Sequence, residues 1–564
     1  MKPVKYLLAM FAFVVLSHGA VALDQTGKKN GFTAGLLAAT DARDAENPIF
    51  EEAIKAGKYE ALVMLGQIGG DACKKLVPFL RSGNVEAQIW AAEGAAYCRD
   101  SALAPLGLGQ MLAATDKSAW AAAVGFSGGE GSKEALVALL NIEGLTRDQK
   151  TAALFGLVQA VAYDRTDAAD IEGLDAGRLV ALVKEGGDVG YAATYVLARL
   201  QAVPDILPAR VFEAAYLKLL SGGYTPEGVD VERLRLQTRL AREYGDFANI
   251  LLWAAASAEE RVIRHEAIRS MGYLSDDKTK ATILALADGE GEAASRHLAV
   301  DALGRRSAAD PALVGLLEQY VSDDNRWVAT TALRWLGQRD AVAANEIAAS
   351  WLTGPDYYLA FQALIALTGS DEGKAILRAY ADANPETVRG FEAAVALDPS
   401  LEAITKPRKT ASAQLLASYK DRELILETTR GKVCISMTGD APYAATSFLQ
   451  LADVGKMDGM LWHRVIPNFV SQAGQIENQE IANWGSIREE WGGEHRIGTV
   501  GVATAGRDTG TTQFFINTGY NMHLDGRYTV FGKVHSDMQV VYALEEGDVI
   551  SKAYTAKAAN TNCD

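Results

Sequence analysis

The feature that most constrains this 564-residue chain is an internal repeat in its middle third. Four segments share an alanine that is followed four residues later by leucine or methionine, and these alanines are 30 to 32 residues apart: Ala267, Ala299, Ala329 and Ala360. Weaker versions of the pattern occur at residues 88–95, 120–125, 151–156 and 191–197. Spacing of this kind predicts an array of similar units rather than one ordinary core.

Each unit is predicted to be a pair of helices, because Ala, Leu and Val recur at helical spacing between Gly, Asp and Ser clusters. The small residue lets the two helices of a pair approach closely, and the leucine four residues on lies on the same helix face. One pair cannot bury its apolar stripe alone, so the pairs must stack. The pattern resembles short HEAT-like repeats; tetratricopeptide repeats are the alternative, but their Trp-Leu-Gly-Tyr pattern does not recur. We therefore expect an all-α solenoid over residues 23–405.

The character of the sequence changes after residue 405. Residues 406–419 are basic and contain Pro407, which predicts an exposed linker with a short helix from residue 411 to 419. Strand-like runs at 424–429 and 432–437 flank Arg430-Gly431, a pattern typical of a β-hairpin. Further strand-like runs cover residues 464–472, 498–504, 513–518 and 529–534. We expect a mainly β domain over residues 420–555 and a tail over residues 556–564.

The first 22 residues have the pattern of a secretory signal peptide. Lys2 and Lys5 precede an apolar run over residues 6–16, and Ala20-Val21-Ala22 has small residues where cleavage would occur. A membrane anchor is the alternative, but the run is shorter than the roughly 20 residues that a membrane-spanning helix needs. We expect an exported protein without a membrane span after cleavage.

Charge and cysteine content limit the partners. The chain has 71 acidic and 55 basic residues, a formal charge of -16, which makes nucleic acid an unfavourable partner. Its four cysteines permit disulfides in an oxidising compartment, and one pairing respects the domain boundaries: Cys73 with Cys98, and Cys434 with Cys563. Free buried thiols are the alternative. No cysteine spacing indicates a metal site.

Two blocks of sequence in the C-terminal domain indicate its chemistry. The first is LWHRVIPNFVSQAG at residues 461–474. The second comprises GTVGVATAG at 498–506, TTQFFIN at 511–517 and LDGRYTVFGKV at 524–534. In order and spacing they resemble the signature blocks of cyclophilins, the peptidyl-prolyl cis-trans isomerases. The resemblance covers about a quarter of the chain. It implies an eight-stranded barrel with capping helices, peptidyl-prolyl isomerase activity, no cofactor or metal, and proline-containing polypeptides as clients.

The reaction explains why such residues are needed. Rotation about an X-Pro bond faces a barrier of about 18–20 kcal/mol, and the twisted transition state has a prolyl nitrogen with a free lone pair. A fixed donor beside that nitrogen favours the twisted state over either planar state, while an apolar pocket holds the proline ring. No nucleophile, metal or general acid is required, because no bond is broken.

The resemblance also assigns roles to residues. It implies catalytic roles for Arg464 as the donor, with Gln472 and Phe469. It implies substrate-binding roles for the following residues: Val470, Ala503, Thr504, Ala505, Gln513, Phe515, His523, Leu524 and Tyr528. As isolated residues, Phe515 and Leu524 would be interpreted as ordinary core, and Arg464 as a solvated or paired charge.

Several positions depart from the best-known eukaryotic pattern. His523 stands in place of a tryptophan that contacts cyclosporin, so we expect weak cyclosporin binding. Val470 replaces a methionine, Thr504 an asparagine, and residues 473–475 read Ala-Gly-Gln instead of Gly-Gly-Asp. Tyr528 replaces a histidine, as in bacterial-type members, which favours a periplasmic location. The substitutions affect the expected rate and substrate preference more than the presence of activity.

Other candidate sites are weak. His265-Glu266 lacks the second histidine of a zinc-protease helix, and Gly128–Gly131 lacks the Lys-Ser/Thr of a phosphate loop. The cluster of Glu489, Glu490, Glu494 and His495 is interpreted as a solvated loop. Two functions follow as hypotheses. One is an isomerase that assists the folding of exported proteins, with the repeats as a protein-binding region. The other is a scaffold whose C-terminal domain only binds proline-containing segments.

Overall fold

The structure is a computed structural model of the chain. It describes residues 31–99, 117–128, 131–164, 176–199, 255–401, 407–477 and 484–557, together with a few isolated positions including 235, 253 and 563. The predicted signal peptide, residues 1–22, lies outside the described residues. None of the described helices combines the length and apolarity needed to cross a membrane.

The described part of residues 31–401 is helical, as the repeat pattern predicts. Inner helices, defined here as those that contact the C-terminal domain, alternate along the chain with outer helices. The inner helices are α1 (Gly31–Asp41), α3 (Glu60–Ile68), α5 (Val85–Cys98), α7 (Ser118–Ser127), α9 (Arg147–Asp164), α11 (Gly187–Arg199), α15 (Arg261–Met271), α17 (Ala293–Arg306), α19 (Arg326–Arg339), α21 (Tyr357–Leu367) and α23 (Val388–Leu397). The helices α2 (Pro48–Lys55), α4 (Val77–Leu80), α8 (Ser132–Leu140), α10 (Ala176–Glu185), α16 (Asp277–Asp288), α18 (Val314–Tyr320), α20 (Ala341–Thr353) and α22 (Asp371–Ala383) cover them from outside.

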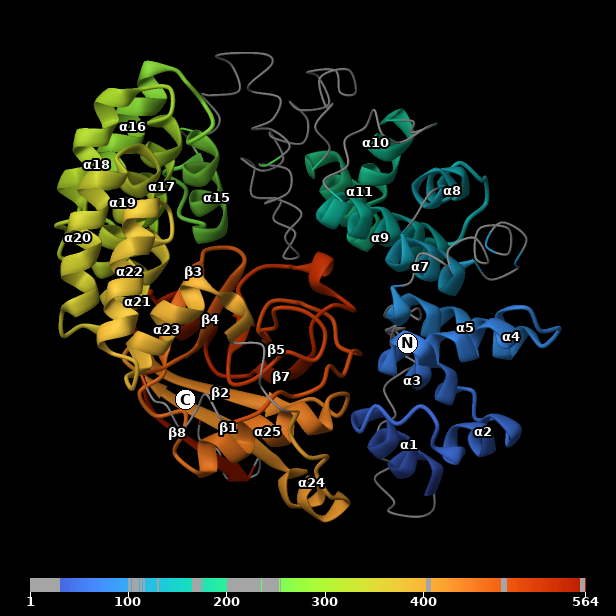
Figure 1. Ribbon diagram of the computed structural model, residues 1–564. Coiled ribbons are helices and arrows are strands. Elements are labelled where there is room, and N and C mark those ends of the chain that lie inside the picture. The colour runs from blue at the N-terminus through green and yellow to red at the C-terminus, as the bar shows by residue number, and fades with distance from the viewer. Residues whose placement is uncertain are drawn as a thin grey trace, which may run out of the picture.

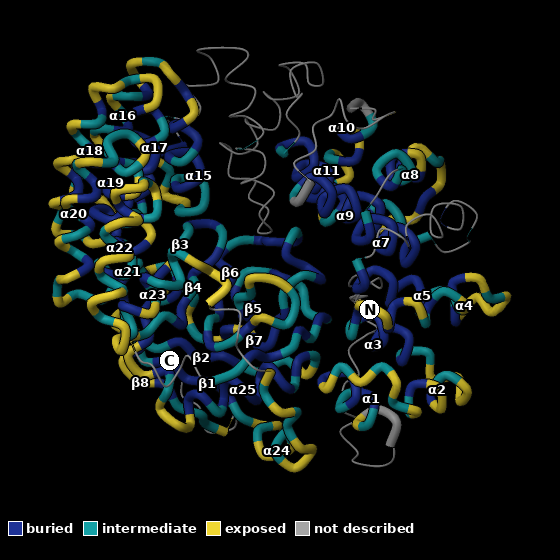
Figure 2. The backbone as a smooth tube through the Cα atoms, in the orientation of Figure 1, coloured by how far each residue is buried: buried dark blue, intermediate teal, exposed yellow. Residues whose placement is uncertain are grey.

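The repeat pattern marks the inner helices. The four aligned alanines are buried on α15, α17, α19 and α21, and the four weaker segments fall on α5, α7, α9 and α11. Many helices begin at an Asn, Asp, Ser or Thr cap; the Asn325 side chain, for example, accepts hydrogen bonds from the first amides of α19. Exposed segments follow the outer helices α16, α18 and α20, whereas the inner helices are mostly buried (Figure 2).

Glycines let successive inner helices touch. A Cβ added to Gly66 of α3 would lie 2.0 Å from the carbonyl oxygen of Gly94 on α5. One added to Gly125 of α7 would lie 2.3 Å from the Cα of Gly156 on α9. At these glycines the close approach is therefore between inner helices of neighbouring pairs, whereas the sequence analysis expected the small residue of the repeat to lie between the two helices of one pair.

The C-terminal domain is a curled, wholly antiparallel sheet of eight described strands in the order β3-β4-β6-β5-β7-β2-β1-β8. The strands are β1 (Arg422–Thr428), β2 (Gly431–Met437), β3 (Leu461–Ile466), β4 (Val470–Gln475), β5 (Thr499–Val502), β6 (Phe514–Asn517), β7 (Val530–Val534) and β8 (Ile550–Lys557). Backbone hydrogen bonds between residues 459–462 and 547–550 join its two edges into a barrel. Helices α25 (Pro442–Asp453) and α27 (Met538–Tyr542) pack on the barrel.

Two details of the barrel differ from the sequence prediction. The single strand-like run at 464–472 is split into β3 and β4 by a tight turn, where Asn468 has a φ of 60°. The predicted linker is not exposed throughout, because Arg408 hydrogen-bonds to Ser447 and Gln450 of α25 and lies over the ring of Trp484. The β1–β2 hairpin and the short helix α24 (Ala413–Tyr419) are confirmed.

The helices form two arms that flank the barrel (Figure 1). The N-terminal arm comprises α1 to α11 and the C-terminal arm comprises α15 to α23. The four cysteines form two disulfides in the pairing that respects the domains. Cys73–Cys98 lies within the N-terminal arm, and Cys434–Cys563 ties the end of the chain to β2 of the barrel.

Candidate active site

The β3–β4 hairpin brings Arg464 and Gln472 together. The two residues are register partners, and Arg464 Nη1 donates a hydrogen bond of 3.1 Å to Gln472 Oε1. Gln472 Nε2 in turn donates to Gln513 Oε1 at 3.0 Å, and Gln513 Nε2 donates to Gln475 Oε1 at 3.2 Å. Arg464 is exposed to solvent, so this glutamine chain holds a cation in place while leaving it accessible to a substrate.

An apolar cluster lies beside the arginine. Val470, Phe515 and Leu524 are buried against one another. Phe469, Ala503 and Tyr528 pack on this cluster and are only partly buried. An apolar recess of this kind, with a fixed cation at its edge, is suited to bind a small apolar ring.

Phe469 joins the cluster to the cation. The Arg464 guanidinium lies 5.7 Å from the centroid of the Phe469 ring, within the range of a cation–π contact. On the other side, His523 stacks on Phe469 with ring centroids 5.6 Å apart and planes 18° from parallel. The contact with His523 holds the Phe469 ring in place, and the ring in turn helps to hold the Arg464 guanidinium.

The segment at residues 503–506 forms another edge of the cluster. The Ala503 amide donates to Gln513 O at 2.9 Å, and the Ala505 amide donates to Thr509 Oγ1 at 2.9 Å. Within the described part of the chain, the main chain of Thr504 forms no hydrogen bond, so its polar groups are left for a bound peptide. Arg507, two residues after Ala505, anchors this segment to the N-terminal arm.

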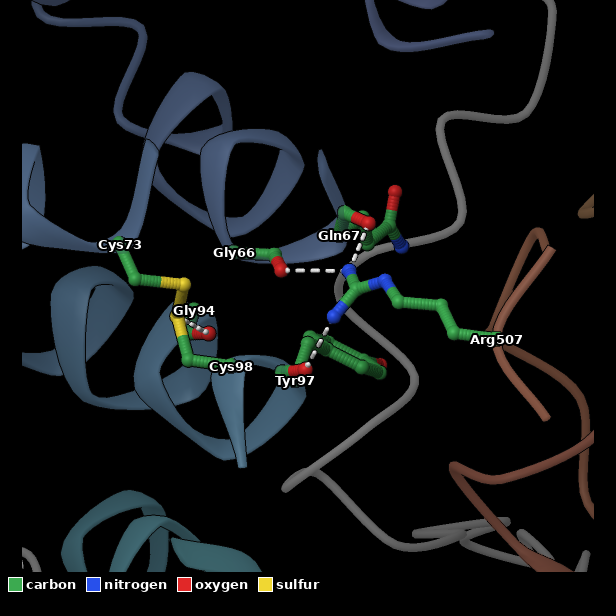
Figure 3. Close-up of a disulfide and its surroundings, with 7 residues drawn as sticks. All are labelled: Gly66, Gln67, Cys73, Gly94, Tyr97, Cys98 and Arg507. Atoms are coloured by element: carbon green, nitrogen blue, oxygen red, sulfur yellow. Dashed lines mark hydrogen bonds between the residues drawn. A yellow bond between two sulfur atoms is a disulfide. The ribbon is translucent and has the colours of Figure 1, made fainter. Parts of the chain in front are cut away.

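Arg507 fixes the segment to the N-terminal arm (Figure 3). Its guanidinium donates to the carbonyl oxygens of Gly66, Gln67 and Tyr97, at the C-terminal ends of α3 and α5. Helix C-terminal carbonyls attract a cation. The Cys73–Cys98 disulfide links the segment after α3 to the last residue of α5 and so holds these two helix ends together.

A buried polar network lies behind the cluster. His495 stacks on Phe515 with ring centroids 5.5 Å apart, and its Nδ1 lies 3.1 Å from Asn517 Nδ2. Burial lowers the pKa of His495 to about 3, so the ring is neutral and accepts the Asn517 hydrogen bond. The interpretation of residues 489–495 as a solvated loop is wrong for His495, which is fully buried.

Two carboxyls border the site: Glu489, for which the interpretation as a solvated loop is also wrong, and Glu546, which the sequence analysis did not single out. Glu489 is buried beneath Thr504, and burial raises its pKa to about 7. Glu546 accepts a hydrogen bond of 2.9 Å from the Val465 amide, next to Arg464 in β3. No motif marks either residue, because both act through contacts between distant segments.

The described residues offer one group of possible metal ligands, Glu423, His535 and Cys563. The Cys563 sulfur is bonded to Cys434, so it is not available as a thiolate. His265 lies on α15, buried beside Glu292, with burial lowering the pKa of its ring. Neither group lies in the apolar cluster.

Comparisons with known proteins match the C-terminal domain. The family model "Cyclophilin type peptidyl-prolyl cis-trans isomerase/CLD" covers residues 424–561. A peptidyl-prolyl cis-trans isomerase of Synechococcus elongatus is 39% identical over 136 residues, which are 23% of this chain and 92% of that protein. Peptidyl-prolyl cis-trans isomerase B of Bacillus subtilis is 40% identical over 116 residues, 20% of this chain and 81% of that protein.

This chain belongs to the cyclophilin family. A crystal structure of a cyclophilin-type isomerase from Cryptosporidium parvum is also similar, with 21% identity and a TM-score of 0.23, covering 24% of this chain and 97% of that one. The family model and the sequence relatives show that the C-terminal barrel is a peptidyl-prolyl isomerase domain, and they leave about three quarters of the chain, including the arms, outside their range.

The cyclophilin domain brings the predicted site residues together. Arg464, Phe469 and Gln472 are linked directly or through one another. Of the predicted substrate-binding residues, these lie in or against the apolar cluster: Val470, Ala503, Phe515, Leu524 and Tyr528. Gln513 extends the glutamine chain, His523 backs Phe469, and Thr504 with the exposed Ala505 forms the edge. The role of each residue stays a prediction.

Proposed function

We propose that this protein is an exported cyclophilin that accelerates cis–trans isomerisation of X-Pro bonds in other exported polypeptides. The observation that carries the proposal is the placement of Arg464. It is accessible, held by Gln472 at 3.1 Å, and lies over Phe469 at the edge of the apolar cluster. The pairing of a positioned cation with an apolar recess is the arrangement that the reaction requires.

The geometry supports a simple mechanism. The proline ring of the substrate occupies the recess of Val470, Phe515 and Leu524, which fixes one side of the X-Pro bond. The main chain of Thr504 binds the adjoining peptide. As the bond twists, the prolyl nitrogen becomes pyramidal and accepts a hydrogen bond from Arg464. The guanidinium favours the twisted state over both planar states and thereby lowers the barrier.

Two disulfides support export, because disulfides persist in oxidising compartments. The periplasm is our proposed location. Expression of the full chain in a bacterium, with fractionation and mass spectrometry of the N-terminus, tests it. Cleavage after residue 22 with a periplasmic product is the expected result, and an uncleaved cytoplasmic product would overturn this part of the proposal.

We further propose that the repeats are a protein-binding region. Their inner helices already contact the cyclophilin domain, so a client must bind the outer helices. Pull-down of exported proteins with the full chain, beside an Arg464→Ala variant that keeps the arms intact, tests this role. Recovery of the same proteins by both is expected; recovery of nothing specific by either would contradict it.

The central experiment measures isomerisation of an Ala-Pro model peptide by the full chain. We expect Arg464→Ala to lower kcat/KM by about a hundredfold, because a positioned donor to the transition state is lost. Arg422→Ala is the matched control, since Arg422 begins β1 and pairs with Asp453; we expect it to retain activity. A folded wild-type chain without activity would overturn the proposal and leave the scaffold hypothesis.

A further inference from the structure

Three aromatic rings form a continuous stack that crosses from the N-terminal arm into the active site. Tyr195 lies on α11, and its ring centroid is 5.6 Å from that of His523, with planes 23° from parallel. The His523 ring also stacks on Phe469, with centroids 5.6 Å apart and planes 18° from parallel. A residue of the helical arm therefore lies only two rings away from the guanidinium of Arg464.

Each end of the stack carries an arginine. Arg199 lies 4.6 Å from the Tyr195 ring centroid, and Arg464 lies 5.7 Å from that of Phe469. Cations are attracted to aromatic faces, and offset stacking of rings adds further stabilisation. The position of the catalytic guanidinium is thus coupled physically to a helix of the arm.

The middle ring is suited to this arrangement because it is uncharged. Burial lowers the pKa of His523 well below its usual value, and the nearby Arg199, Arg235 and Arg527 act in the same direction. A charged imidazolium between two arginine-capped rings would be repelled. A neutral imidazole instead packs against both rings, so the position of Tyr195 constrains the position of Phe469.

The same arm also holds the segment that carries His523. Tyr191, one turn before Tyr195 on α11, donates from its hydroxyl to the Tyr520 carbonyl oxygen at 2.8 Å. On α9, Gln159 Oε1 accepts from Arg527 Nε at 2.8 Å. These contacts lie on both sides of Leu524, a wall of the proline recess, so α9 and α11 fix the segment from residue 520 to 527.

We propose that α11 completes the active site, with Tyr195 as a positioning residue that acts through His523 on Phe469 and Arg464. This inference rests on the proposed isomerase function. It implies that catalysis belongs to the assembled chain, since the arm supplies support that the barrel lacks by itself.

The test uses full-length variants and an Ala-Pro tetrapeptide. Tyr195→Ala and Tyr195→Leu remove the ring, and Leu keeps much of the apolar volume in case Ala disturbs folding. Tyr195→Phe keeps the ring. Tyr320→Ala is the matched control, because Tyr320 of α18 is a buried tyrosine in the core of the C-terminal arm. Values of kcat and KM are measured separately, beside thermal unfolding.

We expect Tyr195→Ala and Tyr195→Leu to lower kcat about tenfold with little change in KM, because misplacement of Arg464 weakens binding of the transition state more than of the substrate. Tyr195→Phe and Tyr320→Ala should stay within about twofold of wild type. Wild-type kcat in both ring-removing variants, or an equal loss of kcat in Tyr320→Ala, would overturn the inference. Inactive wild type would instead overturn the proposed function.

Discussion

The two arms hold the same barrel in different ways. The N-terminal arm contacts the segments that form the edge of the active site, at residues 503–508 and 520–527, mainly through ring stacking and arginine-to-carbonyl bonds. The C-terminal arm contacts β3, β4 and the turn before β8, through carboxylates such as Glu392 and also through arginine-to-carbonyl bonds to Pro467 and Gly547. The first arm therefore holds the segments at the edge of the proline recess, and the second holds the hairpin of β3 and β4 that carries Arg464.

This difference separates stability from catalysis. Both arms bury polar and aromatic groups against the barrel, so both should contribute to the free energy of unfolding. Among the described helices, those of the N-terminal arm contact the segments with Thr504, His523 and Leu524. Changes at these contacts should alter kinetic constants, whereas changes in the C-terminal arm away from Gln475 should mainly alter stability.

The largest expected effect comes from the disulfides. The Cys434–Cys563 disulfide joins residues 129 positions apart and so restricts the unfolded chain. Replacing both cysteines by Ser should lower the free energy of unfolding by about 5 kcal/mol. Replacing Cys73 and Cys98, with separation 25, should lower it by about 3.5 kcal/mol. Urea unfolding measures both.

The N-terminal pair should have an additional kinetic effect. Loss of Cys73–Cys98 loosens the helix ends that hold Arg507, so we expect a higher KM for the Ala-Pro peptide. An unchanged KM in that double variant, under conditions where it is folded, would show that the Arg507 anchor does not depend on the disulfide.

Arg507→Ala should lower the free energy of unfolding by about 3 kcal/mol, because three carbonyl groups lose a charged donor. Arg326→Ala is the control in the C-terminal arm, where Arg326 donates to Gly547 O at 2.9 Å. The control should cost about 1 kcal/mol and leave KM unchanged. A similar rise of KM in both variants would remove the distinction between the arms.

Stability should depend on pH in a way that both arms share. Burial raises the pKa of Glu490 to about 8, and those of Glu489 and Glu392 to about 7. These carboxyls bind protons more tightly in the folded state, so the free energy of unfolding should rise by about 2 kcal/mol from pH 9 to pH 7. Burial lowers the pKa of His297 and His495 to about 3, so below about pH 6.5 the unfolded histidines take up protons and make this rise less steep. Because the three carboxyls bind more protons in the folded state than the two histidines bind in the unfolded state, the free energy of unfolding should still be higher at pH 5.5 than at pH 7.

Urea unfolding at pH 9, 7 and 5.5 tests this expected rise of stability towards lower pH. Glu489→Gln at the N-terminal arm and Glu392→Gln in the C-terminal arm should each flatten the rise between pH 9 and 7. Stability that increases steadily towards pH 9 would contradict the prediction for both arms.

The smallest effect comes from a matched pair of hydroxyl deletions. Tyr191 donates to Tyr520 O at 2.8 Å, and Tyr358 of the C-terminal arm donates to Glu546 Oε2 at 2.7 Å. Tyr191→Phe and Tyr358→Phe should each lower the free energy of unfolding by about 1 kcal/mol. Only Tyr191→Phe should raise KM, by about twofold. A larger kinetic effect in Tyr358→Phe would reverse the proposed roles of the arms.

Sequence alone predicts the parts of this molecule that depend on local pattern. The alanine spacing locates the inner helices, since buried small residues must recur wherever similar helices stack. The blocks around Arg464 and Phe515 identify the barrel and most of its pocket. The turn at Asn468 was missed although Pro467 and Asn468 favour a turn, because the short runs on both sides of this pair are strand-like.

The contacts between arms and barrel could not be predicted in this way. Arg507 bonds to Gly66, 441 positions earlier in the chain, and the stacking of Tyr195 on His523 also joins distant segments. A single arginine or tyrosine is not part of a repeating pattern, so the sequence does not indicate its distant partner. These contacts follow from the curvature of the stack, which depends on the accumulated packing of many helix pairs.

The contact of the inner helices with the barrel has a consequence for how the molecule opens. In an isolated helical array each pair is stabilised only by its neighbours, so terminal pairs unravel first. Here the bond between Arg43 and Asp508 spans 465 positions and closes the first pair onto the last domain. Such distant pairings make folding slow, since the chain must close large loops before they form. Once formed, they tie local openings to the global transition, so backbone amides of α3 should exchange with deuterium as slowly as those of α19.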